Sequence, residues 1–100
     1  MTTPPSPGET RLAASGDLVA STVEQERATL LARIEGLTGP VVFDLSAVKE
    51  IDSLGITLVL GLFKSCQKLG LPFSVEGVSP DILRVFRLFS LPKVFPVKEA

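Results

Sequence analysis

The spacing of apolar residues along this chain predicts three helices. In the first, apolar residues recur at helical intervals between residues 23 and 37, and a Ser-x-x-Glu capping box at residues 21–24 predicts its start. The second is a longer run from Leu54 to Leu69, followed by Gly-Leu-Pro. The third follows Ser-Pro-Asp at residues 79–81, a sequence typical of a helix start.

Four short runs rich in apolar and β-branched residues flank these helices and predict strands: residues 11–15, 41–45, 73–76 and 94–97. The second run is apolar on successive residues, as expected of a strand covered on both faces. Strands that alternate with helices through short connectors pair in parallel through right-handed crossovers. We therefore expect an α/β fold, a small and mostly parallel sheet with helices packed on it. It should form one domain over residues 10–100, after a flexible tail at residues 1–9.

The composition narrows the choice of partners and compartments. The chain has 100 residues, 45% of them hydrophobic, and a net charge of −1. Its basic residues are scattered, so no nucleic-acid footprint is expected. The longest uncharged stretch, residues 53–63, is far shorter than the roughly 20 residues of a membrane span. The single cysteine, Cys66, excludes an intramolecular disulfide and is expected in the core. These features predict a cytoplasmic protein without membrane insertion, and they allow a homodimer.

Few residues in this chain are suited to catalysis. It has no histidine and no tyrosine, and it lacks a glycine-rich phosphate-binding loop. Asp44, Glu50 and Asp52 are the nearest approach to a set of carboxylates for acid–base chemistry. They fall on a strand end, a connector and a helix start, so we do not expect them to act together. The sequence predicts a protein that is not an enzyme and needs no metal or cofactor.

The most informative feature is Asp-Ser-Leu-Gly at residues 52–55, at the start of the second helix. Backbone N–H groups are unpaired at a helix start, so Ser53 could serve as a helix cap. Ser53 could instead carry a phosphate, which would place new charge beside Asp52 and against an apolar interface. Such a phosphate would spare the fold and disrupt a complex.

The second helix has more apolar surface than packing on a sheet requires. Its apolar residues form two neighbouring faces, one of Ile56, Val59, Leu60 and Phe63 and the other of Leu54, Leu58 and Leu62. Two explanations remain open at this point. Another helix covers the second face, or part of that face is exposed to a protein partner. Gly55 favours the partner, because a glycine allows another backbone to approach closely.

These residues resemble the STAS domain family of anti-sigma factor antagonists. The resemblance runs from about Gly16 to Val97 and is strongest at Val-Val-Phe-Asp-Leu-Ser (residues 41–46), Ile-Asp-Ser-Leu-Gly (residues 51–55) and Gly-Val-Ser-Pro (residues 77–80). It implies a sheet flanked by helices in a protein that binds an anti-sigma factor serine kinase and so frees a sigma factor. By position, Ser53 would be the serine that the kinase phosphorylates to switch binding off. The implied partner-binding residues are Asp17, Asp52, Ser53, Leu54, Gly55, Ile56 and Leu58.

Two departures from the family keep a second function open. The family's usual Gly-x-Leu-Asp reads Gly-Asp-Leu-Val at residues 16–19, with valine where an acid is expected. The N-terminal region also holds one plausible strand where the family usually has two. Similar STAS proteins are accessory subunits that bind the ATPase of bacterial lipid ABC transporters, without a phosphorylation cycle. The presence of Ser53 favours the regulatory hypothesis over this alternative.

Overall fold

The computed structural model describes residues 8–100, which form one four-stranded sheet and the helices that connect its strands. The elements are β1 (Thr10–Ala13), α1 (Val23–Ile34), β2 (Val41–Asp44), α2 (Ser53–Lys68), β3 (Phe73–Val78), α3 (Pro80–Leu88), the 3₁₀ helix η1 (Leu91–Lys93) and β4 (Val97–Glu99). The strands lie in chain order and every neighbouring pair is parallel. The predicted α/β fold with helical crossovers is confirmed. Most of the predicted tail, residues 1–7, lies outside the described residues.

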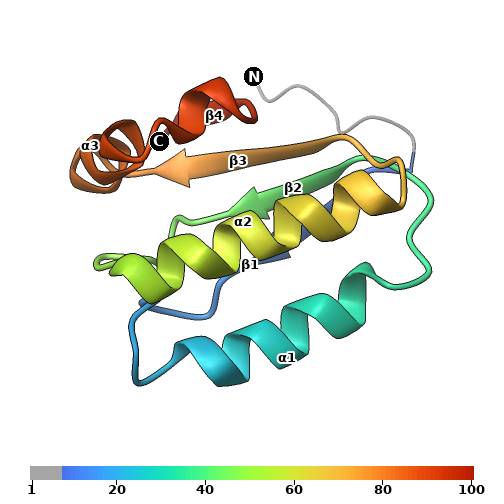
Figure 1. Cartoon of the computed structure of the whole chain (residues 1–100), viewed down its shortest axis with the longest axis horizontal. Coiled ribbons are helices and arrows are strands. Elements are labelled where there is room, and N and C mark those ends of the chain that lie inside the picture. Colours follow the sequence, from blue (N-terminus) through green and yellow to red (C-terminus); the bar gives the residue numbers. More distant parts are fainter. Residues whose placement is uncertain (1–7) are drawn as a thin grey trace.

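Helices α1 and α2 lie side by side across one face of the sheet (Figure 1). Beneath them Leu12, Phe43 and Val75 form one row across β1, β2 and β3, and all three are completely buried. Val41, Val42 and Phe43 of β2 are all buried, so β2 is buried on successive residues, as its sequence predicted. Cys66 of α2 is also completely buried, which confirms its expected place in the core.

The contact between α1 and α2 explains the second apolar face of α2. Leu58 and Leu62, which belong to that face, are buried, and α1 packs against α2. The first of the two explanations, coverage by another helix, is therefore confirmed for these residues. Leu54, at the exposed start of the same face, remains 46% accessible to solvent.

Two local predictions are wrong. The capping box expected at residues 21–24 does not form, because α1 begins one residue later with Thr22 as its N-cap and without a side-chain cap hydrogen bond. The Thr22 hydroxyl instead donates to the carbonyl of Asp17 and accepts from the Val19 N–H, so it closes the preceding turn. The last strand lies at Val97–Glu99 rather than at residues 94–97, because the N–H groups of Val94 and Phe95 bond to the Leu91 carbonyl in the turn that ends η1.

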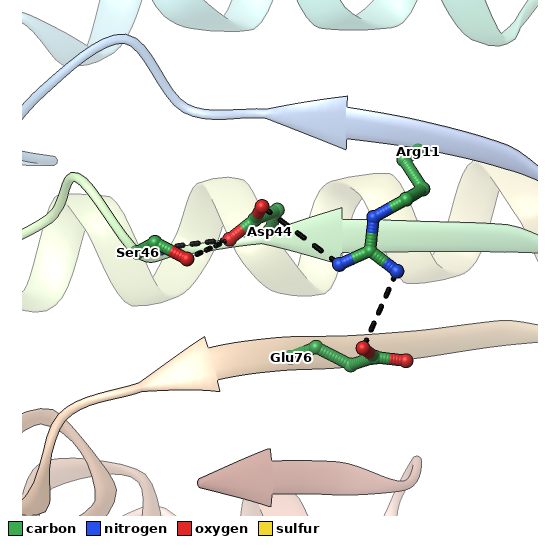
Figure 2. A network of polar contacts seen from close by, with 4 residues as sticks. All are labelled: Arg11, Asp44, Ser46 and Glu76. Atoms are coloured by element: carbon green, nitrogen blue, oxygen red, sulfur yellow. Dashed lines mark hydrogen bonds and ion pairs between the residues drawn. The ribbon is translucent and has the colours of Figure 1, made fainter. Parts of the chain in front are cut away.

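The face of the sheet opposite α1 and α2 carries a polar network (Figure 2). Arg11 of β1 extends across β2, where its guanidinium lies 3.8 Å from the Asp44 carboxylate and 3.3 Å from that of Glu76 on β3. Asp44 also accepts hydrogen bonds from the backbone and hydroxyl of Ser46. The Ser46 hydroxyl, the backbone N–H of Ser46 and Arg11 together hold the pKa of Asp44 below its ordinary value. The network joins three strands on this face.

Candidate functional site

Two loops meet at the carboxyl edge of the sheet and together position the start of α2. The loop after β1 and the loop after β2 pair through a parallel bridge between Leu18 and Ile51. The Leu18 N–H donates to the Glu50 carbonyl at 3.0 Å, and the Asp52 N–H donates to the Leu18 carbonyl at 3.2 Å. This pairing extends the contact between β1 and β2 beyond the sheet. It holds the two loops together.

Asp17 fixes the first loop to the second. One of its carboxylate oxygens accepts the backbone N–H groups of Lys49 at 2.8 Å and Glu50 at 3.1 Å. These two donors hold the pKa of Asp17 below its ordinary value, because they favour the charged form. The family resemblance made Asp17 a partner-binding residue. In the structure it also has a structural role, since it binds a segment more than thirty residues away in the chain.

Asp52, at the end of the second loop, binds the first loop and also caps α2. Its Oδ1 accepts the N–H groups of Leu54 and Gly55, both at 3.0 Å, and its Oδ2 accepts the Ala20 N–H at 2.9 Å. The Gly55 N–H, followed by those of Ala20 and Leu54, holds the pKa of Asp52 below its ordinary value. One carboxylate thus serves as a helix cap and as a link to the neighbouring loop.

Ser53 is the first residue of α2 and is exposed. Its hydroxyl has no hydrogen-bond partner among residues 8–100, whereas its carbonyl accepts the Thr57 hydroxyl at 2.9 Å. Because Asp52 caps the helix, Ser53 is not needed for that role. The N–H groups of Leu54 and Gly55, which could otherwise stabilise an added anion, are already bound to Asp52.

The structure separates the predicted partner-binding residues into accessible and buried ones. Ser53 and Leu54 are exposed, and Asp17 and Asp52 are partly exposed. Gly55, Ile56 and Leu58 are buried, and a Cβ atom on Gly55 would lie 2.2 Å from the Leu18 carbonyl oxygen. The backbone that approaches this glycine therefore belongs to the same chain, which corrects the argument that Gly55 favours a partner. The buried residues support the site from within the core.

Two exposed residues that the sequence did not indicate lie next to Ser53 and Asp52. Thr57 lies one helical turn after Ser53 and is bonded to its carbonyl. Ala20 is exposed and donates its N–H to Asp52. The four-residue spacing could have predicted Thr57, but no local pattern could have predicted Ala20. We define the α2-start surface as Ala20, Asp52, Ser53, Leu54 and Thr57.

The three carboxylates considered for acid–base chemistry do not converge. Asp44 lies in the network on the face opposite α1 and α2 (Figure 2), while Glu50 lies in a loop and Asp52 is bound to N–H groups. Within residues 8–100 no group of histidine, cysteine or acidic residues could hold a metal ion. In the same part of the chain, no helix is long and apolar enough to cross a membrane. The α2-start surface therefore presents the Ser53 hydroxyl, which has no partner among residues 8–100, beside the apolar side chain of Leu54.

Comparisons with known proteins define the class. The chain belongs to the STAS domain family, whose sequence pattern it matches over residues 2–100. It is 30% identical over 82 residues to the intermembrane phospholipid transport system binding protein MlaB of Escherichia coli, with 78% of this chain and 84% of that protein covered.

Solved structures agree on the fold. An anti-sigma-factor antagonist (STAS) domain protein from Planctomyces limnophilus superposes with a TM-score of 0.79 at 24% identity, covering 90% of this chain and 81% of that one. A putative anti-sigma factor antagonist from Thermotoga maritima has the same TM-score at 18% identity, with 93% of this chain and 80% of that one covered. At identities of 24% and 18%, the similarity to these two structures shows only that the fold is shared.

Proposed function

We propose that this protein is a non-enzymatic binding subunit of a lipid-transporting ABC system and contacts its ATPase through the α2-start surface. The observation that carries this proposal is the 30% identity to MlaB, a phospholipid transport system binding protein, over most of both chains. The structural likeness to anti-sigma factor antagonists is at lower identity and supports the shared fold only. The relative therefore favours the function that the sequence argument placed second.

The α2-start surface suits such contact because it offers an apolar side chain on a rigid support. Leu54 is 46% exposed, and the residues that follow it in the first turn of α2, Gly55 and Ile56, are buried. Asp52 and Asp17 tie the two loops beneath it, so little conformational freedom is lost when a partner binds. An exposed leucine beside small polar residues is a reasonable centre for a modest protein interface.

One observation favours a second function, the partner-switching regulator. The Ser53 hydroxyl is exposed and makes no hydrogen bond within the described residues, so a kinase could reach it. A phosphate there would adjoin the Asp52 carboxylate, whose N–H donors are already occupied. The added charge would be repelled and would have to be desolvated in any complex. In this function the partner is an anti-sigma factor kinase, and the protein acts in the cytoplasm.

The test is affinity purification of the tagged protein from its own cells, with mass spectrometry of the proteins that accompany it. The wild type should bring down a transporter ATPase and its permease. Leu54→Asp should lose them, because it places a charge in the apolar centre of the interface. Leu69→Asp is the matched control, since Leu69 is 52% exposed at the other end of α2, and it should retain them.

Two results would contradict the transporter proposal. Recovery of a small ATP-binding kinase, lost in Ser53→Asp and retained in Ser53→Ala, would establish the regulatory function instead. Equal recovery of an ATPase with the Leu54 and Leu69 variants would show that the α2-start surface is not the interface. Ser53→Ala should have little effect if the partner is a transporter ATPase, because it adds no charge to the α2-start surface.

A further inference from the structure

The exposed apolar side chains of this protein gather at the end of α3. Among residues 8–100, five large apolar side chains are exposed, and three of them lie between positions 88 and 94. Leu88 is 78% exposed, Phe89 50% and Val94 45%. The other two, Leu54 and Leu69, lie at opposite ends of α2. We refer to residues 84–94 as the α3–η1 tip.

The tip is an ordered part of the fold. Phe86 and Leu91, which lie on either side of Leu88 and Phe89, are buried at 0% and 1% exposure and anchor the segment in the core. Ser90 adopts a left-handed conformation with φ of 57°, which turns the chain from α3 into η1. The Val94 N–H then donates to the Leu91 carbonyl at 2.8 Å. The exposed side chains are therefore held outward on a fixed backbone.

The tip is also the most basic part of the chain. It contains Arg84, Arg87 and Lys93, all exposed, and no acidic residue. Its formal charge is thus +3, whereas the whole chain carries −1, so the remaining residues together carry −4. Arg84 pairs with Asp81 at 3.6 Å, but both side chains are at least three-quarters exposed and the pair is weak. This asymmetry would turn the tip toward an anionic surface.

We propose that the α3–η1 tip adsorbs reversibly to an anionic membrane surface. Leu88 and Phe89 would enter the boundary between headgroups and acyl chains, and the three basic residues would lie near lipid phosphates. A membrane fits these residues better than a protein groove, because a fluid interface accepts projecting side chains without a matching shape. Each basic residue near such a surface should strengthen binding about fivefold. The tip lies on different elements from the α2-start surface, so this proposal does not depend on the identity of the ATPase.

The test is sedimentation of the full chain with vesicles of two compositions, phosphatidylcholine alone and equal parts of phosphatidylcholine and phosphatidylglycerol. At low salt the protein should sediment with the mixed vesicles only, and added salt should release it. Arg87→Glu and Lys93→Glu should each lower the vesicle-binding constant at least fivefold, since each reverses a charge. Leu88→Ser should weaken binding without changing the unfolding midpoint, because Leu88 is hardly buried.

Matched controls decide whether the tip itself is responsible. Leu69→Ser changes a leucine that is 52% exposed and lies beside basic residues of α2, and Lys64→Glu reverses a charge on that helix. Both should bind as the wild type does. Loss of binding in these controls equal to that in the tip variants would overturn the assignment.

Absence of binding to the mixed vesicles at low salt would overturn the membrane proposal. If the protein then associates with itself in analytical ultracentrifugation, and Leu88→Ser abolishes that association, the tip contacts a second copy instead of a membrane.

Discussion

The starts of α2 and α3 show two ways to cap a helix in the same molecule. At α3, Ser79 is the N-cap, and its hydroxyl accepts the Ile82 N–H at 3.2 Å. At α2, Asp52 is the N-cap, and the serine follows it as the first helical residue. The difference of one position changes the role of the serine. Ser79 is used by its own helix, whereas the Ser53 hydroxyl remains available to other molecules.

The two caps also differ in reach. The Ser79 cap is local, since its bond joins residues three apart. The Asp52 cap extends to Ala20, so it joins α2 to the loop after β1. Asp17, in the loop after β1, in turn accepts the Lys49 N–H of the loop after β2. A change at the start of α3 should therefore weaken one helix. A change at the start of α2 should disturb two loops and the surface they support.

The largest effect on stability is expected from Gly55→Ala. The new Cβ would lie 2.2 Å from the Leu18 carbonyl oxygen, which belongs to the backbone of the paired loop. Overpacking of this kind costs about 1–3 kcal/mol or more, and here the loops must separate. Gly61→Ala is the control in the same helix, because nothing lies within 4 Å of its Cβ position. It should raise the free energy of unfolding by up to about 1 kcal/mol. Urea unfolding measures both, and equal values would contradict the close approach at Gly55.

Replacement of Asp52 should come second and should alter acid stability. Its pKa is lower in the folded protein than the ordinary value of 3.8, so the ionised carboxylate favours the folded state. This contribution is complete above the ordinary pKa and is lost as pH falls through the lower folded value. Asp52→Ala should lower the melting temperature at neutral pH and reduce its further fall in acid. Asp17 retains its own acid dependence in this variant.

Asp52→Asn separates the local cap from the link between the loops. An asparagine oxygen can still accept from Leu54 and Gly55, but its NH₂ group cannot accept from Ala20. The melting temperature of this variant should lie between those of the wild type and Asp52→Ala. An asparagine variant as unstable as the alanine variant would show that the link to Ala20 matters more than the cap.

These contrasts explain what the sequence could predict. Helices and strands followed from local periodicity, and the start of α3 followed from Ser-Pro-Asp at residues 79–81. The failed capping box shows the limit, because the hydroxyl that closes the turn before α1 belongs to Thr22 and bonds to the carbonyl of Asp17. The bonds of Asp17 and Asp52 join loops that are distant in the chain, and no periodic pattern encodes them. The motif indicated the start of α2, and only the fold could show which of its residues are buried.

A smaller effect is expected from Ser79→Ala. Loss of a serine N-cap costs about 1 kcal/mol, because the Ile82 N–H loses its acceptor. The paired loops at α2 should be unaffected. Chemical denaturation measures the loss, and hydrogen exchange should place it in the first turn of α3. Faster exchange at the Leu54 and Gly55 amides would contradict the view that this cap is local.

The smallest effect on stability is expected from Ser53→Ala. Both serines lie at a helix start, but only the Ser79 hydroxyl accepts a bond from its helix, so Ser53→Ala should stay within about 0.5 kcal/mol of the wild type. A loss as large as that of Ser79→Ala would mean that Ser53 serves the fold after all. Equal stability of the Ser53→Ala variant and the wild type leaves the hydroxyl without a structural role. Any effect of Ser53 variants on binding would then arise at the α2-start surface, where an added charge faces the occupied carboxylate of Asp52.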